Sequence, residues 1–144
     1  MKKIFNLWIA KETFDYVANV KQRLNYDDWV NFIDSNKNYF TWQEETEEGK
    51  ETLANIEKVP EGFRERVIKG HSKHKALAEF NSKKGYYEVL ISYNEELGII
   101  STTFQKPVKK QHLNMLLDMA KRLQAYLLNN GTEIIDEKVL DTMG

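Results

Sequence analysis

The segment His71-Ser72-Lys73-His74-Lys75 is the most conspicuous cluster of side chains that could do chemistry. Two histidines three positions apart can share one face of a helix and bind a metal ion. The flanking lysines would repel a cation, however, and no acidic residue has a spacing that would complete a ligand set. We therefore expect a solvated basic loop and predict no metal site.

Two groups of carboxylates could act as acid and base or bind a partner. Asp27 and Asp28 are adjacent, so on a helix their side chains point about 100° apart and do not converge on one reacting atom. Helix capping is the better interpretation of this pair. A general acid and base could also come from the run of Glu44, Glu45, Glu47 and Glu48, if the strand before it lined a cleft. A solvated acidic turn is the commoner structure for such a run.

The sequence lacks every familiar motif for nucleophilic or nucleotide chemistry. It contains no cysteine, which excludes thiol nucleophiles, thiolate zinc sites and disulfides. Its seven glycines form no phosphate-binding loop or dinucleotide fingerprint, and no serine lies in a nucleophile elbow. We therefore predict no cofactor and no catalytic residues, and the sequence favours a protein that is not an enzyme.

The basic loop over residues 69–75 suggests nucleic-acid binding as an alternative. Tyr86 and Tyr87 lie between basic residues, as a base-stacking platform would have them. The net charge is nevertheless −1, the isoelectric point is about 6.3, and no helix-turn-helix, zinc-finger, RRM or KH signature is present. These features disfavour nucleic acid as the partner.

Hydrophobic periodicity predicts the elements that position these side chains. Residues 3–10 fit either a strand or a helix, and residues 12–24 carry a helical stripe. A short helix containing Trp29, Phe32 and Ile33 follows, with Asp27 or Asp28 as its cap.

The next elements lead through the acidic run into a further helix. Residues 39–44 alternate as a strand, and residues 46–58 form either a hairpin or a helix capped by Thr46. Pro60 suits the first turn of the next helix, and Gly70 suits its end. The predicted buried side of that helix consists of Phe63, Val67 and Ile68.

The second half of the chain is more regular. Three alternating segments, at 75–81, 86–93 and 99–105, are joined by short turns and predict an antiparallel meander. Within the second segment Tyr87, Val89 and Ile91 would share one face. A broad apolar stripe over 108–129 predicts one long helix that ends at Asn130-Gly131. The predicted fold class is α+β: an antiparallel sheet packed under this long C-terminal helix, with further helices near the N-terminus.

Size and composition predict one globular domain over residues 1–144. The chain has 41% apolar, 12% aromatic and 30% charged residues, a balance that supplies both a core and a wet surface. The N-terminal segment lacks the small-residue cleavage site of an export signal, and no apolar run approaches the ~18 residues of a membrane span. We expect a cytoplasmic protein.

A protein-binding surface is the function that these features favour. Tryptophan and tyrosine dominate interface energetics, and Trp42, next to the acidic run, is the predicted exposed anchor. The predicted partner-binding residues are Asp27, Asp28, Trp42, Glu44, Glu45, Glu47 and Glu48.

The modest size, α+β pattern, missing catalytic signature and acidic and aromatic residues are similar to those of the small cytoplasmic immunity proteins that neutralise bacterial toxins. The likeness is one of class and carries no residue-by-residue correspondence. It implies a stoichiometric inhibitor of another protein, such as a basic toxin domain, whose association an acidic patch would steer. The alternatives are a small enzyme with a site assembled from dispersed Glu and His residues, or a nucleic-acid-binding module that uses the 69–75 loop.

Overall fold

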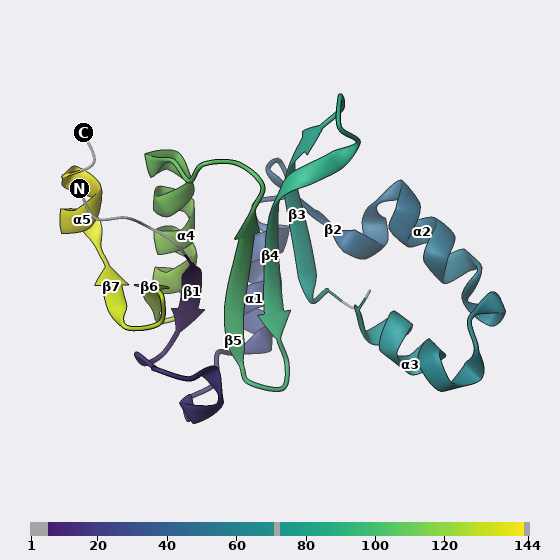
Figure 1. Ribbon diagram of the computed structural model, residues 1–144, viewed down its shortest axis with the longest axis horizontal. Helices are drawn as coiled ribbons and strands as arrows, with labels where there is room; N and C mark the ends of the chain where they lie inside the picture. Colours follow the sequence, from purple (N-terminus) through teal and green to yellow (C-terminus); the bar gives the residue numbers. More distant parts are fainter. Residues whose placement is uncertain (1–5, 71–72, 143–144) are drawn as a thin grey trace.

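The computed structural model describes residues 6–70 and 73–142 and shows an α+β fold built on one antiparallel sheet of seven strands (Figure 1). The strand order is β2-β3-β4-β5-β1-β6-β7. The strands are β1 (Leu7–Ala10), β2 (Phe40–Trp42), β3 (Lys75–Asn81), β4 (Tyr86–Asn94), β5 (Ile99–Phe104), β6 (Tyr126–Asn129) and β7 (Glu133–Ile135). The helices are α1 (Tyr26–Asp34), α2 (Glu47–Ala54), α3 (Glu61–Gly70), α4 (Lys110–Arg122) and α5 (Glu137–Asp141), with short 3-10 turns at Val17–Asn19, Gln43–Glu45 and Ile56–Lys58.

Helices α1 and α4 cover one face of this sheet, the helix-covered face. The main core lies beneath them, where Trp29 of α1 meets Trp42 of β2 edge-to-face, with ring centroids 5.7 Å apart. Val89 and Ile91 of β4 are completely buried in the same core. In Figure 1 α1 lies behind β4 and β5, so the opposite face, the open face, is turned toward the viewer.

The predicted helix over 108–129 is wrong in its length. Helix α4 ends at Arg122, Gln124 turns the chain with a positive φ of 54°, and residues 126–129 form β6 between β1 and β7. Leu127 packs into the main core and Leu128 into a smaller cluster on the other side of the sheet. A strand that is buried on both faces has apolar residues at consecutive positions. In the sequence, these residues are indistinguishable from a continuation of the apolar stripe of the helix. The helix at the C-terminal end is the five-residue α5.

The predicted helix over 12–24 is also wrong, since only Val17–Asn19 form a single 3-10 turn. The Glu12 carboxylate accepts hydrogen bonds from the backbone N–H groups of Lys21 and Gln22 and so organises a loop. This loop crosses part of the open face, where Phe14 packs edge-to-face on Trp8 at 5.7 Å. The apolar residues of the segment therefore cover the sheet without forming a helix.

An arm over residues 47–70 extends from the β2 side of the sheet (Figure 1). Helix α2 is the helical alternative predicted for 46–58, and the Thr46 hydroxyl caps it by accepting the N–H of Gly49 at 3.0 Å. Helix α3 follows, but Phe63 and Ile68, predicted to be buried, are 55% and 48% exposed. An arm that stands away from the core cannot bury the apolar side of its second helix. Over the residues described, no helix combines the length and apolar character that crossing a bilayer requires.

Candidate functional site: a groove on the open face

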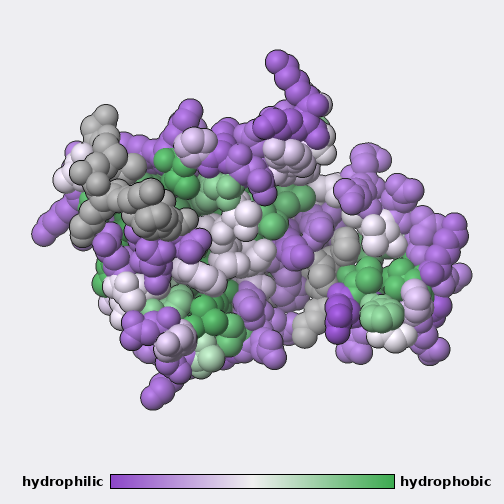
Figure 2. All heavy atoms as spheres, in the orientation of Figure 1, coloured by the Kyte–Doolittle hydropathy of each residue, from purple (hydrophilic) through white to green (hydrophobic). Residues whose placement is uncertain are grey.

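A cavity of about 640 Å³, here called the groove, opens on the open face between α2 and the β3–β4 hairpin (Figure 2). Its floor is one transverse row of neighbours in the sheet: Leu77 pairs with Leu90, and Leu90 pairs with Thr103. These side chains alternate with Ala76, Ala78, Val89 and Ile91, which face the helices. The alternation of a regular sheet therefore explains the floor.

The walls of the groove do not follow this alternation. Leu77 and Phe80 both line the groove although they lie three residues apart in one strand, which would normally place them on opposite faces. Glu79, between them, has a positive φ of 56°. The pairing register is the same on both sides of Glu79, as Ala78 pairs with Val89 and Phe80 with Tyr87, so no residue is inserted. The left-handed backbone of Glu79 instead breaks the alternation, so that Phe80 lines the groove together with Tyr86 and Tyr87. Residues 80–87, the outer part of the hairpin, are here called the hairpin tip.

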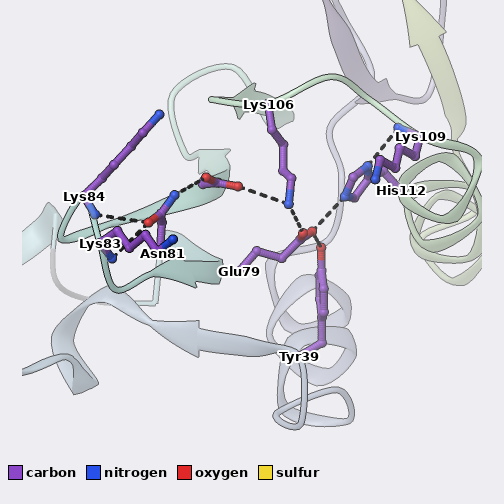
Figure 3. A network of polar contacts seen from close by, with 9 residues as sticks. Tyr39, Glu79, Asn81, Lys83, Lys84, Lys106, Lys109 and His112 are labelled. Atoms are coloured by element: carbon purple, nitrogen blue, oxygen red, sulfur yellow. Dashed lines mark hydrogen bonds and ion pairs between the residues drawn. The ribbon is translucent and has the colours of Figure 1, made fainter.

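The carboxylate of Glu79 points toward α4, where three partners hold it (Figure 3). Oε1 accepts a hydrogen bond from Lys106 Nζ at 2.8 Å. Oε2 accepts from the Tyr39 hydroxyl and from His112 Nε2, the latter at 2.7 Å. Lys106 also reaches the carboxylate of Glu88, 3.0 Å away on the neighbouring strand. We call these five side chains the Glu79 network.

Both ring nitrogens of His112 form hydrogen bonds within the fold. Nδ1 accepts the backbone N–H of Lys109 at 2.9 Å, and this bond caps the N-terminus of α4. The proton of the neutral ring therefore lies on Nε2 and points at Glu79. No lone pair is left to take a proton from a substrate, so His112 serves to connect α4 with the hairpin.

Electrostatics maintain the ionised state of Glu79. Partial burial by itself would raise the pKa of this carboxyl, but the hydrogen bonds from Lys106, Tyr39 and His112 outweigh it and lower the pKa to about 2. Burial, followed by the bond to Glu79, raises the pKa of Tyr39 far above its ordinary value. Hydrogen bonds to Glu79 and Glu88 raise the pKa of Lys106. The network is thus a carboxylate held by the Lys106 ammonium, the Tyr39 hydroxyl and the His112 ring.

Aromatic side chains of the hairpin tip form one wall of the groove. Phe80 and Tyr86 are 56% and 39% exposed, and Phe80 contacts Tyr87 with ring centroids 5.0 Å apart. The turn between the strands is held by Asn81, whose side-chain oxygen accepts the N–H groups of Lys83 and Lys84, both at 3.1 Å. The wall is therefore apolar, exposed and supported by a well-ordered turn.

The 3-10 turn at Gln43–Glu45 and the start of α2 form the opposite wall. Gln43, Thr46, Glu47, Glu48, Gly49 and Thr52 line this side. Gly49 is required here, because a Cβ at this position would lie 2.0 Å from the backbone oxygen of Gln43. The close approach of turn and helix fixes where the two glutamates stand.

No family model, curated protein or solved structure matches this chain.

The structure separates the predicted partner-binding residues. Asp27 and Asp28 lie exposed in the first turn of α1, on the helix-covered side, and the cap of that helix is Asn25, which accepts the N–H of Asp28 at 3.0 Å. Of the seven, only Glu47 and Glu48 line the groove.

The remaining predicted residues stabilise the fold around β2. Trp42 is completely buried, and its indole N–H donates to Asp34 at 2.8 Å, so the prediction that it is exposed is wrong. Glu44 accepts the N–H of Lys73 at 2.9 Å, and Glu45 pairs with Lys37. Regular alternation placed Trp42 on the same face as Phe40, and that face is the core face.

The apolar groove residues Leu77, Phe80 and Leu90 are not among the residues predicted from the sequence. Two aromatic residues that flank a turn, Phe80 and Tyr86, are the sequence signal for this wall, whereas Tyr86 and Tyr87 between basic residues favour a base-stacking platform. His71 lies outside the described residues, and His74 packs against Tyr26 with ring centroids 5.5 Å apart. Within the described ranges no group of His, Asp and Glu side chains has a geometry that could hold a metal ion.

Proposed function

We propose that this chain is a non-catalytic protein-binding domain whose partner docks in the groove. The observation that carries the proposal is the groove itself, in which exposed Phe80 and Tyr86 rise beside an apolar floor. Exposed aromatic side chains in a concave surface are the residues that most often dominate the free energy of protein association. A protein partner would bury these rings, which water contacts in the free chain.

The arrangement of ionisable groups supports binding over catalysis. The tightest cluster, the Glu79 network, uses the nitrogens of His112 and both oxygens of Glu79 for bonds within the fold. A general base needs a lone pair within reach of a substrate proton. The groove is lined by glutamates of the first turn of α2 and by hydroxyl, amide and aromatic groups, a set suited to contact.

The more specific form of the proposal is an immunity-type inhibitor that neutralises a bacterial toxin. Such an inhibitor needs a rigid complementary surface and no chemistry, and the groove lies on a seven-stranded sheet whose helix-covered face carries the main core. A basic toxin domain is the partner whose charge suits Glu47 and Glu48.

Partner capture with a matched pair of variants tests the proposal. Phe80→Ser removes an exposed ring from the groove, and Tyr126→Ser removes an exposed ring, 47% accessible, from β6 outside it. We expect a partner purified from the native host to bind the wild-type chain and Tyr126→Ser equally, and Phe80→Ser at least about tenfold more weakly by calorimetry.

The proposal fails if Phe80→Ser binds that partner as tightly as the wild type does. Equal melting temperatures of the two variants ensure that folding is not the cause of a loss. For the toxin-inhibitor form, co-expression of the partner must arrest growth, and the wild-type chain must relieve the arrest while Phe80→Ser does not.

A further inference from the structure

We infer that the groove receives an arginine side chain from the partner protein. This inference rests on the proposed function and adds the chemistry that the groove recognises. Three features of the lining carry it: the sign of its charges, the exposed faces of its aromatic rings, and a buried hydrogen-bond acceptor.

The charges that line the groove are of one sign. Of the fourteen described residues around the cavity, the charged ones are Glu47 and Glu48, and none is Lys, Arg or His. Both glutamates are exposed and stand in the first turn of α2. They line the α2 side of the groove, across from the hairpin tip, so a cation in the groove would have anions on one side and rings on the other.

The aromatic wall already accepts a cation. The ammonium group of Lys84 lies over the ring of Tyr86, 5.9 Å from its centroid. The negative face of an aromatic ring attracts cations within about 6 Å, and arginine adds stacking of its planar group. Lys84 reaches this ring from the hairpin turn, while Phe80 and Tyr87 present further aromatic surface to the cavity.

A buried acceptor completes the recognition set. The side-chain oxygen of Gln43 is inaccessible to solvent and has no hydrogen-bond partner among the described residues, and Gln43 lines the groove. Leaving a buried acceptor unpaired is unfavourable, so a rotation of the Gln43 side chain that brings this oxygen to a donor of the partner would be favoured. An arginine guanidinium offers five N–H donors in one plane, and its three methylene groups suit a floor of Leu77 and Leu90.

The cavity of about 640 Å³ exceeds the volume of one side chain. An arginine therefore enters together with the residues beside it in the partner chain. This size excludes tight binding of free arginine, and a capped single residue should bind with a dissociation constant in the millimolar range, typical of a ligand with so few atoms.

Nuclear magnetic resonance titration with N-acetyl-arginine amide tests the inference. We expect saturable shifts of the backbone amides of Gly85, Leu90, Thr103 and Gln105. N-acetyl-citrulline amide, which has nearly the same shape but no charge, should bind at least about threefold more weakly, as expected for exposed ion pairs. N-acetyl-lysine amide should also bind more weakly, because it lacks the planar donor fork.

Matched double variants assign the effect to the groove. Glu47→Gln with Glu48→Gln should weaken arginine binding by about threefold to tenfold, whereas Glu61→Gln with Glu65→Gln, two glutamates of α3 outside the groove lining, should leave it unchanged. The inference is overturned if citrulline or lysine binds as well as arginine, or if the shifts lie outside the groove.

These outcomes are separable from the proposed function. If Phe80→Ser loses the protein partner while arginine and citrulline bind equally, the groove is the docking site but does not recognise a cation. If Phe80→Ser keeps the partner, the proposed function itself is wrong, whatever the titration shows.

Discussion

At the scale of single residues, the groove depends on Glu79, whose left-handed backbone lies within a strand. A non-glycine residue in this conformation costs on the order of 1–3 kcal/mol and persists only where its surroundings stabilise it. Tyr39, Lys106 and His112 provide that stabilisation, and each comes from a different part of the chain. One strained residue thus breaks the alternation of its strand, and both Leu77 and Phe80 line the groove.

The lowered pKa of Glu79 predicts that its contribution to stability decreases as pH falls. Its pKa in the folded chain is about 2, compared with an ordinary value of 4.5. A lowered pKa stabilises the fold above pH 4.5, and this contribution is lost as pH falls from 4.5 toward 2. In Glu79→Gln the free energy of unfolding should therefore be lower at pH 7, and the gap to the wild type should narrow by on the order of 2–3 kcal/mol at acid pH.

Urea unfolding at a series of pH values measures this gap. Glu61→Gln, a change at an exposed glutamate of α3, serves as the control and should keep a small and constant difference from the wild type. A gap for Glu79→Gln that stays constant between pH 7 and pH 2 would show that the network does not hold the carboxylate in its ionised form.

At the scale of elements, the start of α2 is fixed by the absence of a side chain at Gly49. Glycine inside a helix is normally destabilising by up to about 1 kcal/mol relative to alanine. Here an added Cβ would meet the Gln43 oxygen at 2.0 Å and the Gln43 carbonyl carbon at 2.9 Å. The turn that begins with Gln43 and helix α2 can pack together only because this position has no Cβ.

Gly49→Ala should therefore destabilise the chain, against its helix propensity, by roughly 1–3 kcal/mol, the usual cost of overpacking. Gly62→Ala is the matched control, because nothing lies within 4 Å of the Cβ added in α3. It should be neutral or stabilising by up to about 1 kcal/mol. Thermal unfolding of both variants measures the change in stability relative to the wild type. A Gly49→Ala variant that is more stable than the wild type would contradict the close approach of turn and helix.

At the scale of the whole molecule, the sheet is completed by a strand from the far end of the sequence. Strand β6 pairs with β1 through Trp8 and Leu128, and through Ile9 and Leu127. Leu127 belongs to the core under the helices, whereas Leu128 belongs to the cluster under the 11–20 segment. Both side chains are fully buried although they are adjacent, as a central strand requires.

This placement predicts the effect of truncating each leucine. Leu127→Ala and Leu128→Ala should each lower the free energy of unfolding by about 2–5 kcal/mol, the range for buried leucines. Tyr126→Ala, at the exposed start of the same strand, should cost well under 1 kcal/mol. Denaturant titration of the three variants provides the comparison, and a small effect at Leu128 would be incompatible with a strand buried on both faces.

The sequence by itself determined the features that depend on neighbours along the chain. Alternation and short turns predicted the three meander strands between residues 75 and 105, which the structure confirms. The apolar stripe predicted a helix from residue 108, and α4 begins at Lys110. Only the tertiary structure decided that this helix stops at Arg122, because Leu127 and Leu128 satisfy either periodicity until β1 pairs with them. The groove is likewise tertiary, since the left-handed backbone of Glu79 is stabilised by Tyr39 and His112, which local periodicity cannot bring together.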